Sequence, residues 1–166
     1  MKKIFALTLA ASLLGGLYGM TFGLGAAYDN IAGPEGTDPY LAIRADVVVK
    51  PLPVVGFRMG LIAVDLKPDE MGGTAYVFGT GVSTDVLAYI PMAGMVSPYI
   101  PLGFWYSGNG SSVLHLKGGL GAEFTFGGFG AYLEGGINFY NISVGDVSDS
   151  QNPLYVQGGF KIPVKF

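Results

Sequence analysis

The chain has 166 residues, which is enough for one domain but not for a second large core. Half of the residues are hydrophobic, only 13% are charged and 28 are glycine, whereas a soluble domain usually has about 25% charged residues and about 7% glycine. A net charge of −3 argues against a nucleic-acid partner, which requires clustered Lys and Arg. The absence of cysteine excludes disulfides and thiolate chemistry.

After the N-terminus, no uncharged apolar run approaches the ~20 residues that a membrane helix requires. The composition nevertheless lacks the polar coat of a soluble domain. A closed β-barrel is the other structure that satisfies every backbone polar group within lipid. The composition therefore favours an all-β chain.

The N-terminus has the pattern of a secretory signal peptide. Lys2 and Lys3 precede an apolar run from Ile4 to Leu14. A membrane anchor is the alternative, but the five glycines between residues 15 and 25 would each cost a helix about 1 kcal/mol relative to alanine. We predict a signal peptide over residues 1–19 and a barrel over residues 20–166.

Alternation of apolar residues with polar residues or glycine predicts eight strands, because successive side chains of a strand point to opposite faces. In chain order these strands cover residues 21–28, 40–49, 54–64, 74–90, 95–106, 112–126, 129–141 and 154–166. Polar loops are expected at 29–39, 65–73 and 141–152, and short turns at 50–53, 91–94 and 127–128. In the third strand, Ala63 falls on the apolar, outward parity.

The fifth strand fits this pattern least well. Pro98 and Pro101 each remove a donor from the ladder, and a closed barrel has no free edge where that loss would be harmless. We therefore expect a bulge or a late start to this strand.

The sixth and seventh strands predict their own register. A two-residue turn at Gly127-Gly128 pairs Phe126 with Phe129, which brings the apolar parities of both strands onto one face. The same register places Glu134 opposite Gly121 and Lys117 opposite Asn138.

The last strand ends in Phe166, with apolar residues at alternating positions before it. This pattern resembles the C-terminal strand of Gram-negative outer-membrane β-barrel proteins. Short turns also alternate with mostly long, polar loops, and aromatic residues gather near both strand ends, as in bacterial outer-membrane barrels. Over nearly all of its length after the signal peptide, the chain resembles the small eight-stranded family that includes the OmpA transmembrane domain, OmpX and OmpW.

The resemblance implies an eight-stranded antiparallel up-and-down transmembrane β-barrel in the cell outer membrane, with both termini in the periplasm. It also implies that the protein is a monomer whose partners are outer-membrane lipid and the barrel-assembly machinery. The assembly signal would lie in the last strand and comprise Phe160, Ile162, Val164 and Phe166. A secreted soluble eight-stranded barrel is the rival, but it requires a polar outer face.

Charged residues fall on the inward parity of the predicted strands. They are Arg44, Asp46, Arg58, Asp85, Lys117, Glu123 and Glu134, followed by Lys161 and Lys165. These lumen charges either gate a pore or form a structural network. We favour the network, because eight strands leave an interior just wide enough for side chains.

The predicted register separates Lys117 from Glu134 by four positions. At ~3.3 Å per residue this is about 13 Å along the barrel, too far for contact. We therefore expect Lys117 to pair with Asp85 or Asp46, and Glu134 to pair with Arg58 or Lys161.

His115, the only histidine, lies close to Ser111 and Ser112. Some outer-membrane lipid A deacylases place Ser, His and an acid near the barrel rim, which requires a Ser oxygen within hydrogen-bond reach of the imidazole. The strand parity instead points His115 inward. We expect no catalytic residue.

The acidic loops lack the Asp-x-Asp-x-Asp-Gly spacing of a calcium site, and no P-loop, dinucleotide fingerprint or zinc spacing occurs. We expect no cofactor and no metal. A structural or surface-interaction barrel is the first functional hypothesis, a narrow non-specific porin-like channel the second, and a lipid A-modifying enzyme the third.

Overall fold

The computed structural model describes residues 19–33, 38–69, 73–79, 84–108, 111–144 and 147–164. The predicted signal peptide lies outside these residues apart from Gly19, and so do Lys165 and Phe166. Within these residues, all regular elements are strands: β1 (Gly19–Ile31), β2 (Tyr40–Leu52), β3 (Val55–Pro68), β4 (Thr74–Gly79), β5 (Thr84–Tyr89), β6 (Val96–Gly108), β7 (Ser111–Phe126), β8 (Phe129–Val144), β9 (Val147–Gln151) and β10 (Leu154–Val164). No helix among the described residues is long and apolar enough to cross a membrane.

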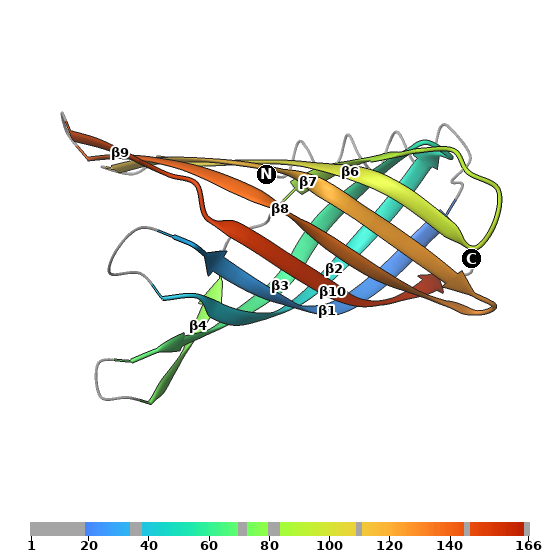
Figure 1. Cartoon of the computed structure of the whole chain (residues 1–166), viewed down its shortest axis with the longest axis horizontal. Helices are drawn as coiled ribbons and strands as arrows, with labels where there is room; N and C mark the ends of the chain where they lie inside the picture. Colours follow the sequence, from blue (N-terminus) through green and yellow to red (C-terminus); the bar gives the residue numbers. More distant parts are fainter. Residues whose placement is uncertain are drawn as a thin grey trace.

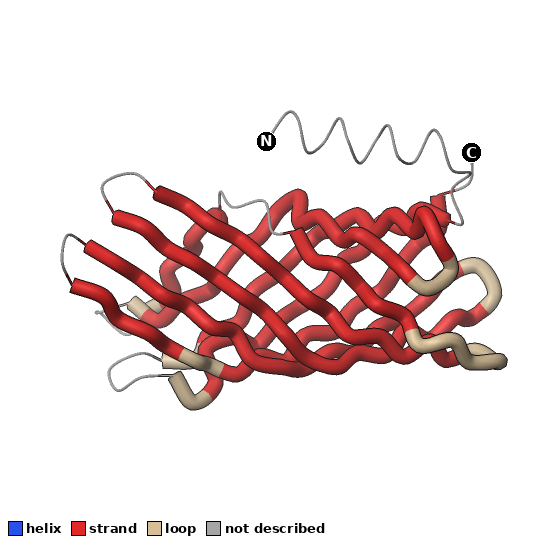
Figure 2. Tube along the Cα trace, turned by 90° about the horizontal axis from the view of Figure 1, so that it is seen from above, coloured by secondary structure: helices blue, strands red, loops and turns tan. Residues whose placement is uncertain are grey.

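The strands form a closed antiparallel barrel (Figures 1 and 2). The hydrogen-bonded order runs β10-β1-β2-β3-β5-β6-β7-β8, and β8 pairs with β10 to complete the ring. β4 pairs with β3, and β9 pairs with β8. The predicted strands over 74–90 and 154–166 therefore correspond to β4 with β5 and to β10. The all-β, eight-stranded, up-and-down fold is confirmed.

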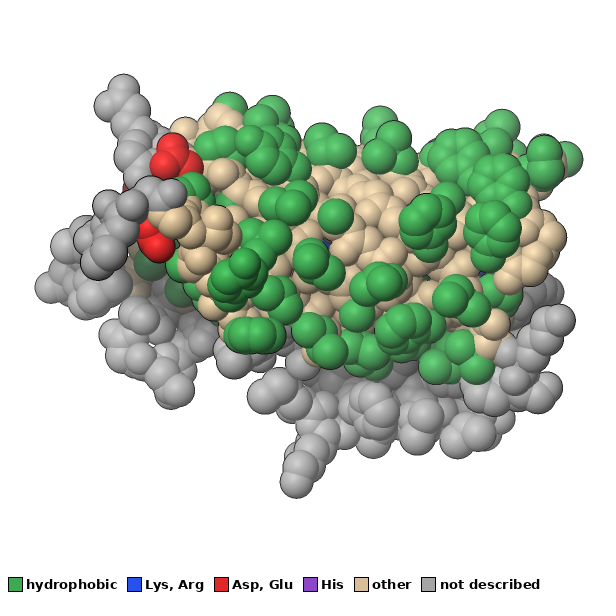
Figure 3. Space-filling view, turned by 90° about the horizontal axis from the view of Figure 1, so that it is seen from below, with side chains coloured by type: hydrophobic (Ala, Val, Ile, Leu, Met, Phe, Trp, Pro, Cys, Tyr) green, Lys and Arg blue, Asp and Glu red, His purple; other side chains and the backbone are tan. Residues whose placement is uncertain are grey.

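Burial alternates along the strands, most clearly in β10. Tyr155, Gln157 and Lys161 are buried inside the barrel, whereas Val156 and Phe160 are exposed on the outside. Figure 3 shows the result on one face, where hydrophobic side chains cover the barrel wall and acidic residues gather at one end. Polar side chains thus fill the inside, and apolar ones cover the outside.

β6 continues through both of its prolines, so the predicted bulge or late start is wrong. Tyr99 pairs with Gly121 and Leu102 with Gly118, which means that the register is the same on both sides of Pro101. In an antiparallel sheet, successive residues of a strand direct their backbone N–H groups alternately to the strand on one side and the strand on the other. Each proline therefore removes one backbone hydrogen bond, to one of the two neighbouring strands. The fully buried Pro101 ring also fills space in the interior.

A bulge occurs instead in β3. Ala45 pairs with Ile62 and Asp46 with Gly60, which leaves Leu61 without a partner on β2. The extra residue reverses the strand parity beyond it. Leu61 and Ile62 are both exposed, while Ala63 faces a cavity inside the barrel. The outward placement predicted for Ala63 is therefore wrong.

Two predicted loops largely form hairpins. β3 continues to Pro68, which pairs with Thr74 of β4, and β8 continues to Val144, which pairs with Val147 of β9. Both hairpins project from the same end of the barrel (Figure 1). The opposite end has short connections, including Gly127, whose φ of 57° is the left-handed conformation that a tight hairpin turn requires. Met20 and Val164 pair at that end.

Candidate functional site in the barrel interior

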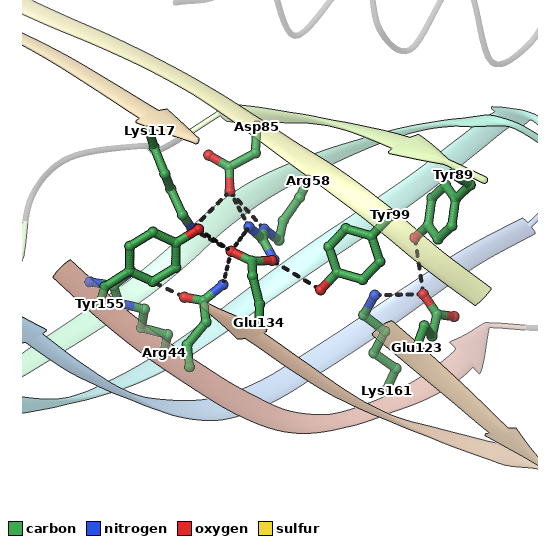
Figure 4. A network of polar contacts seen from close by, with 11 residues as sticks. Arg44, Arg58, Asp85, Tyr89, Tyr99, Lys117, Glu123, Glu134, Tyr155 and Lys161 are labelled. Carbon is green, nitrogen blue, oxygen red and sulfur yellow. Dashed lines mark hydrogen bonds and ion pairs between the residues drawn. The ribbon is translucent and has the colours of Figure 1, made fainter. Parts of the chain in front are cut away.

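Glu134 is the centre of a polar network inside the barrel (Figure 4). β8 carries it on the inward parity, and it is 1% exposed. Arg58 of β3 donates from Nη1 to Oε2 at 2.8 Å and from Nη2 to Oε1 at 3.0 Å. Lys117 Nζ of β7 lies 2.8 Å from Oε1. Two cations from two other strands therefore contact this one carboxylate.

Three neutral groups complete the surroundings of Glu134. The hydroxyls of Tyr99 and Tyr155 donate to it at 2.9 Å and 3.0 Å, and Gln157 Nε2 donates at 2.8 Å. Burying a carboxylate costs several kcal/mol unless its oxygens are paired and hydrogen-bonded. These donors supply that compensation, so Glu134 holds together β3, β6, β7, β8 and β10.

Asp85 shares both cations with Glu134. Arg58 Nε donates to Asp85 Oδ2 at 2.8 Å, Arg58 Nη2 contacts the same oxygen, and Lys117 Nζ lies 3.5 Å from it. The guanidinium thus bridges two carboxylates, a geometry that its planar fork of donors allows. The pairs of Lys117 with Asp85 and of Glu134 with Arg58 are both present.

The prediction that Lys117 and Glu134 lie too far apart for contact is wrong. The register is as predicted, since Glu134 lies opposite Gly121 and Lys117 opposite Asn138. The predicted separation of about 13 Å is the distance between backbone positions along the strands, not between the ends of the side chains. A four-carbon lysine side chain and a glutamate side chain that lean toward each other close that separation.

A second cluster lies nearer the end with the short turns, around Glu123. Lys161 Nζ is 2.7 Å from its Oε2, the Tyr89 hydroxyl donates to the same oxygen at 2.9 Å, and Lys50 Nζ is 3.3 Å from Oε1. Lys161 also lies 5.5 Å from the centre of the Tyr99 ring. Tyr99 therefore contacts the groups around both glutamates.

Apolar side chains fill the space beside these clusters. Val48 and Leu87 are completely buried and form a core with Tyr89 and Tyr99, whose ring centres are 5.4 Å apart. Cavities of about 370 Å³ and 400 Å³ lie on either side of this core, and no described residue lines both cavities. The described side chains thus separate the two cavities.

Arg44 and Asp46 occupy the part of the interior nearer the projecting hairpins. Arg44 pairs with Asp29 of β1, and its Nη1 donates to Gln157 Oε1 at 3.4 Å. Asp46 is buried, and its Oδ1 has no hydrogen-bond partner among the described residues. Of the sequence-predicted lumen charges that the structure describes, Asp46 is thus the one outside the network.

His115 Nε2 lies 3.1 Å from Asn138 Oδ1, and its ring stacks on Tyr140 with the ring centres 4.3 Å apart. Among the described side chains, no hydrogen bond joins His115 to a serine or an acid; the side chains of Ser111 and Ser112 are not among those described. Within the same residues, no group of three or more His, Asp or Glu side chains could hold a metal ion.

Sequence reasoning missed several members of the network. The sequence pattern places Asp29 in a loop and Lys50 in a turn, yet in the structure Asp29 shares the inward parity of Ala27, and Lys50 that of Val48. Tyr99 gave no signal, because a tyrosine suits either face of a barrel wall. Of the predicted assembly signal, Phe160, Ile162 and Val164 are exposed on the outer face of β10, and Phe166 lies outside the described residues.

The sequence matches no model of a known protein family and no curated protein.

Proposed function

We propose that this chain is an integral outer-membrane β-barrel protein, similar to the small eight-stranded family, with a structural or surface-interaction role and a lumen closed by ion pairs. The observation that carries this proposal is the distribution of polarity: charged side chains are paired inside the barrel, and large apolar side chains cover its outside.

The apolar surface is continuous across neighbouring strands. Leu24 of β1 pairs with Phe160 of β10, and Phe160 pairs with Ala131 of β8. Leu120, Leu133 and Phe160 are 70%, 59% and 64% exposed. Soluble monomers rarely expose contiguous apolar patches larger than a few hundred Å². A hydrocarbon environment removes this penalty, which supports the membrane over a soluble barrel.

The two ends of the barrel differ, which supports one orientation of the barrel in the membrane. Acidic residues gather at the end with the projecting hairpins (Figure 3), and the other end has short connections and the paired ends of β1 and β10. Bacterial outer-membrane barrels have short periplasmic turns and longer external loops. We assign the hairpin end to the cell exterior and the turn end to the periplasm.

Membrane integration is tested by fractionation of the cells that express the protein. The barrel should stay with the outer-membrane fraction after carbonate extraction, and it should migrate faster on a gel unheated than after boiling. A mature protein that stays in solution without detergent would contradict the proposal.

The interior argues against a steady pore, because the network around Glu134 and the tyrosine core lies between the two cavities. A structural barrel does not change the chemistry of lipid A.

Lipid A mass spectra from cells with and without the protein should therefore be identical. Deacylated lipid A that disappears on His115→Ala would establish an enzyme in place of a structural barrel.

A further inference from the structure

The cavity of about 370 Å³ lies at the hairpin end of the interior. This volume is within the range of pockets that hold small organic molecules, roughly 300–1,000 Å³. Its lining combines the aromatic side chains Tyr40, Trp105 and Tyr140 with charged groups deeper in the barrel. The cavity is therefore suited to a molecule with an apolar body and a polar head.

Most charges near the cavity are already neutralised. Arg58 and Lys117 are matched by Asp85 and Glu134, which contact both cations. Arg44 pairs with Asp29. These ion pairs contain equal numbers of cations and anions, so they leave little net charge to attract an ion of either sign.

The mouth of the cavity already contains an ammonium group. Lys67 Nζ lies 3.6 Å from Asp65 and 4.5 Å from the centre of the Tyr40 ring. A carboxylate together with an aromatic face is an arrangement that attracts organic cations. The rim beside Asp65 and Tyr40 thus accommodates an ammonium group.

Asp46 is the exception deeper in the cavity. It is 5% exposed and lines the cavity, yet no hydrogen bond or ion pair reaches it from the described residues. Its carboxylate lies over Gly23 of β1, in space that a side chain at that position would fill, and no described donor reaches Oδ1. Arg58 and Lys161 act on Asp46 electrostatically, but neither forms an ion pair with it. Burial of an ionised carboxylate without an adjacent cation costs several kcal/mol, which a bound cation would offset.

We propose that this cavity binds a small organic monocation, with its ammonium or guanidinium head on Asp46 and its apolar body directed toward the aromatic side chains at the hairpin end. A metal ion fits less well, because no three described ligand side chains converge there. The proposal depends on the cavity alone. It goes beyond the membrane function and can fail without affecting it.

The test uses three probes with one four-carbon body: n-butylammonium, n-butanol and n-butyrate. Trp105, the only tryptophan of the chain, lines the cavity and reports on occupancy by its fluorescence. Folded protein in a non-ionic detergent should respond saturably to n-butylammonium at concentrations at least tenfold below those at which n-butanol or n-butyrate acts.

Two variants locate the site. Asp46→Asn removes the charge at constant shape and should weaken n-butylammonium binding at least tenfold. Ala63→Leu fills the cavity from the wall without changing any charge, and should also abolish the response. Asp149→Asn, on the exposed β9, removes a carboxylate outside the cavity and should bind like the unmodified protein. Heat-modifiable migration verifies that each variant is folded.

Three outcomes would overturn the proposal: equal responses to n-butanol and n-butylammonium, preference for n-butyrate, or unchanged binding by folded Asp46→Asn. If Asp46→Asn does not fold, the comparison of the three probes on the unmodified protein and the Ala63→Leu result decide the question.

Discussion

Glu134 stabilises the barrel from within because one carboxylate accepts hydrogen bonds from four different strands. Glu134→Gln keeps the shape of the side chain but removes its charge. Arg58 and Lys117 would then share only Asp85. Breaking a buried ion pair costs about 3–5 kcal/mol, and the amide of Gln retains part of the hydrogen bonding. We expect a clear fall in the melting temperature measured in detergent.

The control for this variant is Asp149→Asn, because Asp149 lies on the exposed β9 and contacts Gln151. It should melt like the unmodified protein. An equal melting temperature for Glu134→Gln would show that the network contributes little stability.

Two adjacent glycines of β8 differ in the space around them. A Cβ on Gly136 would overlap the carbonyl oxygen of Gly118 and lie 2.6 Å from Cα of Gly119, whereas a Cβ on Gly135 would meet Tyr155 O at 3.5 Å, an ordinary contact. Gly136→Ala should therefore lower the yield of folded barrel strongly, and Gly135→Ala should leave it nearly unchanged. Heat-modifiable migration measures that yield. Equal yields would mean that β7 and β8 can separate to admit a methyl group.

At the scale of the strand, sequence alternation predicted much of the fold. The parities of β7, β8 and β10 and the Gly127-Gly128 turn follow directly from the residue pattern. The bulge at Leu61 was invisible, because Leu61 and Ile62 are both apolar and either suits the outer face. The sequence does not predict the β8–β9 hairpin, because Val147 is the only apolar residue of β9 and gives no alternation. Asn141 donates to Ser148 and Ser150 there, and these polar contacts stabilise the hairpin.

The lumen network could be predicted only in outline. Strand parity identifies which charged side chains face inward. Their ion-pair partners depend on the length and the direction of the side chains, as Lys117 and Glu134 show. Tyr99 donates a hydrogen bond to Glu134 because β6 places it at the height of Glu134 along the barrel. The pattern of residue types does not predict that height.

The outer face of β8 offers a test of the membrane proposal. Leu133 is already 59% exposed, so in water an arginine at this position would cost little. In lipid, an arginine near the midplane of a barrel wall costs about 2–4 kcal/mol. We expect Leu133→Arg to lower the free energy of unfolding from lipid vesicles by that amount. Met92→Arg, in the exposed connection between β5 and β6, should have a much smaller effect. Equal effects would indicate that Leu133 does not face lipid.

The terminal strand is expected to direct assembly. Its apolar residues alternate in the sequence up to Phe166, a pattern that resembles the strands recognised by the barrel-assembly machinery. Deletion of Phe166 should leave unassembled, protease-sensitive protein in the periplasm. Phe129→Ala removes an exposed aromatic from the start of β8 and should assemble normally. Normal insertion of the Phe166 deletion would remove the assembly role from this strand.

At the scale of the whole molecule, the two cavities have no described lining residue in common. We therefore expect no steady conductance from the purified protein in planar bilayers. Glu134→Gln should not change this, since the core of Val48, Leu87, Tyr89 and Tyr99 remains. A conductance that appears in the variant would show that the ion pairs gate a pore, and it would make the porin-like function the better hypothesis.

Closure of the ring also brings the two described ends of the chain together, since Met20 pairs with Val164. A short linker could therefore join them, and new ends could be opened within the β8–β9 hairpin, which leaves the order of strands around the ring unchanged. Such a circular permutant would keep every ladder of the barrel but would place β10 before β1 in the order of synthesis. The position of β10 in the barrel wall and its position in the order of synthesis are thus two separable properties of one strand.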